Sequence, residues 1–175
     1  MGLTIFNTIV GIGIISIIVG IVLVFAMIFL QETDSKLFRW IKKHSLTIAF
    51  LLALGGMIGS LIYSNVFMFA PCEFCWWQRI FLYPQVIILG VAAWYRDVRI
   101  GTISIILSVI GICISIYHVL LQAGAVGSGA ACALTGVSCT RIDVLIFGWI
   151  TIPIMCLVLF VGILTFAYLA HRKEA

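Results

Sequence analysis

Long apolar segments separated by short polar gaps make up almost the whole chain. Five of these segments reach the ~20 residues that a helix needs to cross the hydrocarbon core of a bilayer. Their apolar positions are continuous and do not alternate with a period of two, which favours spanning helices over barrel strands. The predicted spans are Leu3–Leu30, Ser45–Phe69, Phe74–Tyr95, Ile100–Gln122 and Val144–Ala170.

The first and third spans have unusual features. The first has no basic residue before it and no small-residue cleavage site after it, so we interpret it as a retained span and not as a signal peptide. It is longer than a bilayer requires, and it must therefore tilt or project beyond the hydrocarbon layer. The third contains Arg79 near its start and Pro84 further in. The missing N–H of the proline predicts a kink there.

The composition agrees with a membrane protein. Apolar residues make up 64% of the chain and charged residues 9%, and the mean hydropathy is +1.29, far outside the range of soluble domains. The net charge of +4 comes from basic residues in the gaps between spans, not from a patch suited to nucleic acid. We therefore predict an all-α integral membrane protein that does not bind nucleic acid.

The basic residues also predict the orientation of the chain in the membrane. Cytoplasmic flanks of spans carry an excess of Lys and Arg. The gaps after the first and third spans, together with the C-terminus, hold all basic residues except Arg79 and Arg141, so we expect them to be cytoplasmic. The N-terminus and the 123–143 loop then lie outside. The cytoplasmic set is Lys36, Arg39, Lys42, Lys43, Arg96, Arg99, Arg172 and Lys173.

Four of the six cysteines form two close pairs on the predicted outer side. Cys72 and Cys75 form a C-x-x-C pair in the gap before the third span, and Cys132 and Cys139 lie in the outer loop. Thiol pairs form disulfides readily on the oxidising side of a membrane. The loop pair has two interpretations on chemistry alone: a redox pair that exchanges with a partner, or a static disulfide that only restrains the loop.

Two polar side chains near the first pair are candidates for a cofactor site. Arg79 lies four residues after Cys75 on the same helix face, where its charge favours the thiolate that thiol exchange needs. An arginine at this depth is costly, which favours a functional role over simple snorkelling to headgroups. His118 lies at a similar depth in the fourth span, where it either binds a cofactor or is hydrogen-bonded within the bundle.

Other features of the spans have a structural interpretation. Cys113 and Cys156 lie inside spans, where an isolated cysteine behaves as a small apolar residue. Gly55 and Gly59 form a G-x-x-x-G pattern, which we interpret as close helix packing within the bundle. The span Leu3–Leu30 contains no Cys, His or charged residue, so we expect it to lie outside the active site.

The residues around the two cysteine pairs resemble those of a known family. The segment 71–79, PCEFCWWQR, precedes a Tyr-Pro pair, and the loop pair precedes Gly148-Trp149 and Ile152-Pro153 at the entry to the last span. This combination resembles the DsbB family of membrane disulfide-forming proteins, most closely its BdbC branch from Gram-positive bacteria. The resemblance covers residues 45–170 and implies a four-helix transmembrane bundle, to which residues 1–30 add one N-terminal transmembrane helix.

The resemblance also implies a function. In this family a loop pair exchanges with a thioredoxin-like extracytoplasmic thiol oxidase, a membrane-edge pair receives the electrons, and an arginine and a histidine lie beside the quinone (menaquinone or ubiquinone) that accepts them. Cys132 and Cys139 match the loop pair, and Cys72 and Cys75 match the membrane-edge pair. Arg79 and His118 match the arginine and the histidine beside the quinone. The expected protein is a quinone-dependent protein-disulfide oxidoreductase of the bacterial cell membrane, without a metal.

Two other functions fit parts of the pattern. A vitamin K epoxide reductase-type enzyme also combines two cysteine pairs and a quinone in a four-helix bundle. In that family the loop pair precedes the membrane C-x-x-C, whereas here it follows. A zinc-binding module could use the four outer cysteines as ligands, although the oxidising side favours disulfides over a zinc site.

Overall fold

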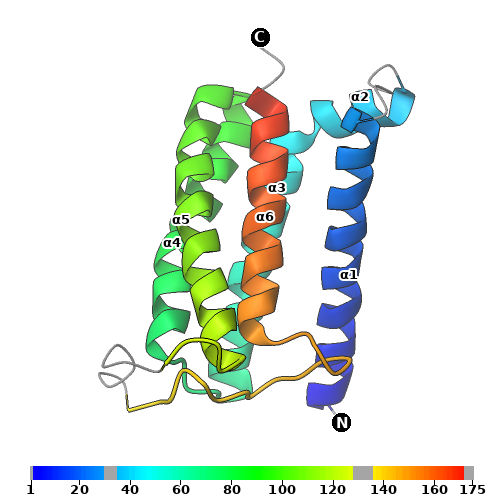
Figure 1. Cartoon of the computed structure of the whole chain (residues 1–175). Coiled ribbons are helices and arrows are strands. Elements are labelled where there is room, and N and C mark those ends of the chain that lie inside the picture. The colour runs from blue at the N-terminus through cyan, green and yellow to red at the C-terminus, as the bar shows by residue number, and fades with distance from the viewer. Residues whose placement is uncertain (1, 30–34, 128–135, 172–175) are drawn as a thin grey trace.

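The computed structural model describes residues 2–29, 35–127 and 136–171. Figure 1 shows α3, α4, α5 and α6 side by side in a bundle, with α1 standing next to α6. The short helix α2 lies at the end of the bundle where α6 finishes. The helices are α1 (Gly2–Phe29), α2 (Lys36–Lys43), α3 (Ser45–Leu61), the π-helix η1 (Ile62–Val66), α4 (Glu73–Tyr95), α5 (Val98–Gln122) and α6 (Ile152–His171).

The helices confirm the predicted membrane architecture of a four-helix bundle with one additional N-terminal helix. Among the described residues, α1, α3 with η1, α5 and α6 are long and apolar enough to cross a membrane. Helix α4 has 23 residues, which is also sufficient length. Two polar side chains of this helix form hydrogen bonds inside the bundle. Buried Gln78 hydrogen-bonds Ser115 of α5, and buried Gln85 hydrogen-bonds Ser108 of α5. The helix continues through Pro84.

The last predicted span is wrong at its start. Val144–Ala170 was expected to be helical throughout, but α6 begins at Ile152. Before it, Ile146 and Ile150 form an isolated bridge around a tight turn. Phe147 and Gly148 in this turn have φ angles of 52° and 81°, in the left-handed region that a right-handed helix does not contain. The segment is apolar because it packs against its neighbours in the bundle, and not because it continues the spanning helix.

Helix α5 presents a buried face of small side chains to the bundle, and one of them lets α6 approach closely. Gly101, Ser104, Ser108, Gly111 and Ser115 are all buried and recur at the spacing of one helix face. A Cβ added to Gly111 would lie 2.5 Å from the ring of Phe160, itself fully buried in the main apolar core. Glycine at this position therefore sets the distance between the two helices.

The G-x-x-x-G pattern of α3 does not pack as predicted. A Cβ built on Gly55 or Gly59 would have no heavy atom within 4 Å. The glycine that packs is Gly56, whose added Cβ would lie 2.8 Å from Leu159 of α6. Gly55 and Gly59 border a cavity instead.

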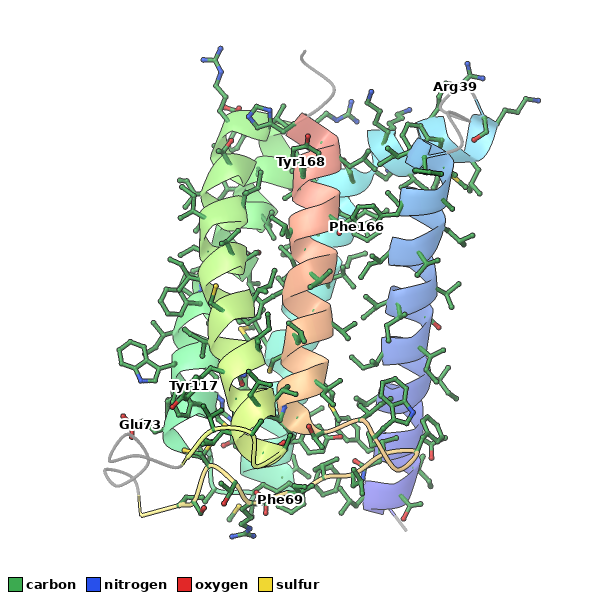
Figure 2. The ribbon with its side chains drawn as sticks, in the orientation of Figure 1. Arg39, Phe69, Glu73, Tyr117, Phe166 and Tyr168 are labelled. Carbon is green, nitrogen blue, oxygen red and sulfur yellow. The ribbon has the colours of Figure 1, made fainter. Side chains whose placement is uncertain are left out.

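The two ends of the bundle hold different parts of the chain. Arg39, on α2, lies at one end, and Phe69 and Glu73 lie at the other (Figure 2). The start of α1 and the finish of α6 are also at opposite ends (Figure 1), as an odd number of crossings requires. The end that holds Glu73 also holds the 136–151 segment, so the candidate site residues gather there.

Candidate functional site

The C-x-x-C pair lies at the start of α4. Cys72 is the residue before the first helical position and Cys75 lies in the first turn, so the helix brings the sulfurs together. Their Sγ atoms are 2.8 Å apart and both thiols are free. Cys72 is buried. The hydrogen bond from Cys75 and a contact with His118 lower the pKa of the Cys72 thiol, against the effect of its burial. The chain therefore favours a thiolate at Cys72, whereas the sequence had pointed to Cys75.

His118 joins the two cysteine-bearing segments. Its Nε2 lies 3.7 Å from Sγ of Cys72 and 3.2 Å from the backbone oxygen of Cys139. A carbonyl oxygen only accepts hydrogen bonds, so this contact requires the proton on Nε2. The other ring nitrogen, Nδ1, is buried and has no hydrogen-bond partner among the described residues. His118 thus lies beside the first pair, and its cofactor role stays a prediction.

Cys139 is held in the bundle and is not presented to solvent. Its side chain is 1% exposed and packs with Cys72 and Leu121, and its sulfur is in a disulfide. The amide of Gln122 donates to the backbone oxygen of Arg141 at 3.0 Å, which holds the segment after Cys139 against α5. Cys132, the predicted partner of Cys139, lies outside the described residues.

Arg79 faces the same region, but its contacts differ from those expected. Its guanidinium donates to the backbone oxygen of Ser60 at 3.2 Å and lies 5.3 Å from the ring centroid of Trp76. Among the described residues it makes no hydrogen bond to either sulfur of the C-x-x-C pair. Arg79 thus joins α4 to α3 and contributes a positive charge to the site over a longer distance.

A cavity of about 260 Å³ connects these residues. Side chains from all five long helices line it, together with residues before α4 and before α6. Its polar lining includes Cys72, Cys75, Gln78, Arg79 and His118, and much of the remainder is aliphatic or glycine. A mostly apolar cavity with a few converging polar groups is typical of a small-molecule site.

Sequence reasoning missed several residues of this cavity. Gln78 is 2% exposed, and its Oε1 has no partner among the described residues; a glutamine in an apolar span, three residues after Cys75, was the available signal. Cys156 also lines the cavity, which its interpretation as a small apolar residue inside a span did not anticipate, whereas Cys113 does not line it. Helix α1 was expected to lie outside the site, but Val10 and Ile14 are in its lining.

The sulfurs of Cys72 and Cys75 and a ring nitrogen of His118 lie within 4.8 Å of one another, close enough to hold a metal ion. The zinc module considered from the sequence needs four thiolates. Cys139 is in a disulfide and cannot supply one. The geometry therefore favours disulfide chemistry over the four-cysteine zinc site.

Comparison with known proteins identifies the family. The family model for "Disulfide bond formation protein DsbB" matches residues 42–170, which include every site residue described above except those of α1. The chain belongs to the DsbB family. It is 40% identical over 127 residues to "Disulfide bond formation protein C" of Bacillus subtilis, covering 73% of this chain and 92% of the relative.

Other relatives agree with this assignment. The chain is 33% identical over 136 residues to "Probable disulfide formation protein C 2" of Bacillus cereus, covering 78% of this chain and 97% of the relative. No solved structure matches the chain. The family and the apolar helices identify a multi-pass bacterial membrane protein that acts as a disulfide oxidase. The vitamin K epoxide reductase alternative is set aside, because it belongs to a different family.

Proposed function

We propose that this protein reoxidises a thioredoxin-like thiol oxidase outside the membrane and delivers the electrons to a membrane quinone. The observation that carries the proposal is the convergence of Cys72, Cys75 and the Cys139 backbone on His118, at the polar end of a largely apolar cavity. A thiol pair that opens into such a cavity can exchange electrons with a membrane-soluble molecule while remaining next to the segment that carries the second pair.

The cavity fits a quinone. Two buried acceptors, Gln78 Oε1 and His118 Nδ1, lack donors among the described residues, and such atoms are costly unless a ligand or water satisfies them. The hydroxyls of a reduced quinol would donate to these atoms, and the Arg79 guanidinium would donate to a carbonyl of the oxidised ring. Arg79, Gln78 and His118 would hold the polar ring, and the aliphatic lining would hold its apolar part. When bound, a quinone supplies an acceptor for two electrons and two protons.

The thiol steps balance as two successive exchanges. A partner dithiol reduces the proposed Cys132–Cys139 disulfide and leaves as a disulfide. The resulting Cys132–Cys139 dithiol reduces a Cys72–Cys75 disulfide and is itself reoxidised. The Cys72–Cys75 dithiol then gives up two electrons and two protons. His118 keeps the Cys139 backbone beside Cys72 for the second exchange, and it favours the Cys72 thiolate.

The positions of the two pairs support this order of events. Cys72 and Cys75 line the cavity, whereas Cys139 is not in its lining. We infer that the cavity-lining pair is the one that faces the final acceptor.

The experiment is a reconstituted electron transfer. Purified protein is mixed with a reduced thioredoxin-like partner and either menaquinone or ubiquinone, and quinone reduction is followed by absorbance. Wild type and Cys113→Ala should reduce quinone at equal rates, because Cys113 does not line the cavity. Cys75→Ser should reduce none. Reduction that persists in Cys75→Ser would contradict the proposal, as would stoichiometric zinc in the active protein.

A further inference from the structure

Helix α1 borders the cavity although the match to the family model begins only at residue 42. Val10, Gly13, Ile14 and Ile17 are its lining residues. Their spacing of three, four and seven residues places them on one face of the helix. The part of the chain that lies outside the family match therefore forms one wall of the site.

Contacts at several points fix this wall. Gly11 is buried against the turn before α6, where an added Cβ would lie 2.6 Å from Phe147 Cε2. Tyr63 of η1 donates its hydroxyl to Asn7 Oδ1 at 2.8 Å. On α6, an added Cβ at Gly162 would lie 3.2 Å from Ile17 Cγ2. Helix α1 is thus docked on α6, on the turn before it and on the end of α3–η1.

Facing glycines leave a gap between α1 and the middle of α3. A Cβ built on Gly13 of α1, or on Gly55 or Gly59 of α3, would have no heavy atom within 4 Å. All three line the cavity, and Gly13 and Gly55 are exposed. The cavity therefore has a lateral opening between α1 and α3, in addition to the opening at its polar end.

The opening lies within the hydrocarbon core of the bilayer. Gly13 is about 16 Å along α1 from Gly2, at a rise of ~1.5 Å per residue, and the 28-residue helix exceeds the ~30 Å core by only about 12 Å. The surface outside a gap at this depth is lipid hydrocarbon. A molecule that uses both openings has a compact polar head beside Arg79 and Gln78 and a long apolar chain that leaves between α1 and α3.

We propose that α1 completes the site by forming, with α3, a slot for the prenyl chain of the quinone. This inference rests on the proposed function. The slot is defined by Gly13, Gly55 and Gly59. At its inner end, the buried Oε1 of Gln78 has no donor among the described residues and would accept from a hydroxyl of the reduced ring. Helix α1 then determines how well the protein discriminates between quinones with and without a long chain.

The test compares two ligands on variants of the full-length protein. The ligands are a quinone with a chain of several prenyl units and the same ring without the chain, and binding is measured as quenching of tryptophan fluorescence. Gly55→Leu and Gly13→Leu should each weaken binding of the prenylated quinone about tenfold, because the added side chain displaces roughly two methylenes of the chain. Binding of the chain-free ring should not change. Gly20→Leu is the matched control, since Gly20 also has open space around its Cβ position but does not line the cavity.

The outcomes separate the slot from the proposed function. Equal weakening of both ligands, or of neither, in correctly folded variants would overturn the slot. Native mass spectrometry that finds a phospholipid retained by wild type and lost from Gly55→Leu, with quinone binding unchanged, would also overturn it in favour of a lipid chain. Chain-dependent binding without any quinone reduction would leave the slot standing and refute the proposed function.

Discussion

Nε2 of His118 lies 3.2 Å from the backbone oxygen of Cys139, and the same nitrogen lies 3.7 Å from Sγ of Cys72. One imidazole thus connects a loop backbone to a thiol in another part of the chain. The side chain is 1% exposed, so surrounding atoms fix its position. We expect His118 to have two effects: it holds the loop segment in place, and it stabilises negative charge on Cys72.

The second effect predicts a pH dependence. Because the hydrogen bond from Cys75 and the contact with His118 lower the pKa of Cys72, alkylation of reduced Cys72 should stay fast as the pH falls below the usual thiol range. His118→Ala should move the loss of reactivity to higher pH by about one unit. The measurement is the rate of alkylation at Cys72, resolved by peptide mass spectrometry.

The linked change in stability has a defined sign. A lowered folded-state pKa contributes stability above the unfolded pKa, and this contribution is lost as the pH falls through the folded value.

His44→Ala is the control for the alkylation experiment, because His44 lies between α2 and α3, at the other end of the bundle. An unchanged pH profile in His118→Ala would show that His118 only positions the loop.

A second prediction concerns charge at the cavity. Cys75→Ser should abolish electron delivery to quinone because it removes one sulfur of the pair. Arg79→Ala keeps both sulfurs but removes the cation and the hydrogen bond to Ser60. We expect it to slow delivery about tenfold, equivalent to ~1.4 kcal/mol. Arg79→Lys should lie between wild type and Ala, since lysine keeps the charge and loses the planar fork.

The readout separates the two exchanges in these variants. The proposed loop pair should still react once with reduced partner, after which reduced partner should accumulate. Arg99→Ala is the control, because Arg99 lies outside the cavity lining. A wild-type rate of quinone reduction in Arg79→Ala would make Arg79 only a link between helices α4 and α3.

The sequence predicted which residues lie close together better than it predicted their contacts. Helix periodicity places Cys75 and Arg79 on one face, and span length places His118 at a similar depth. These rules do not identify the atom that a flexible guanidinium reaches, and Arg79 in fact bonds the Ser60 carbonyl. Nor do they reveal the preference for a thiolate at Cys72, which depends on the hydrogen bond from Cys75 and on a histidine 46 residues away.

The role of α1 could not be predicted because its sequence lacks an amphipathic pattern. Apolar residues surround the helix on all sides, so periodicity does not distinguish a lipid-facing surface from a packed one. For the same reason, the sequence could not predict which of Gly55, Gly56 and Gly59 packs against another helix. Only the positions of α1 and α6 determine that Gly56 packs on Leu159 while its neighbours face open space.

A third prediction concerns sidedness. The Lys and Arg distribution places the N-terminus outside and the C-terminus in the cytoplasm, and the start of α1 and the finish of α6 lie at opposite ends of the structure (Figure 1). Reporter fusions active on only one side of the membrane should therefore give opposite signals at the two termini. Matching cytoplasmic signals would mean that α1 does not span, and the cavity wall described above would be lost with it.

The fourth prediction tests how α1 is held. Tyr63 is buried on the π-helix, donates its hydroxyl to Asn7 of α1 and packs edge-on against Phe6, with 5.1 Å between ring centroids. Tyr63→Phe keeps the ring contact and removes the hydrogen bond, leaving the Asn7 oxygen without its donor. We expect a loss of ~0.5–1 kcal/mol in stability, the usual net value for such a bond in a membrane bundle.

The measurement is the thermal midpoint of the purified protein together with its affinity for the prenylated quinone. Both should fall in Tyr63→Phe, because a less firmly held α1 also loosens the slot. Tyr168→Phe is the matched control: Tyr168 is 59% exposed near the other end of the bundle, away from the cavity lining (Figure 2). A lower midpoint with unchanged quinone affinity would mean that the Asn7–Tyr63 bond stabilises the fold without shaping the site. Unchanged values for both would mean that packing against α6 and the turn before it holds α1 without help from this hydrogen bond.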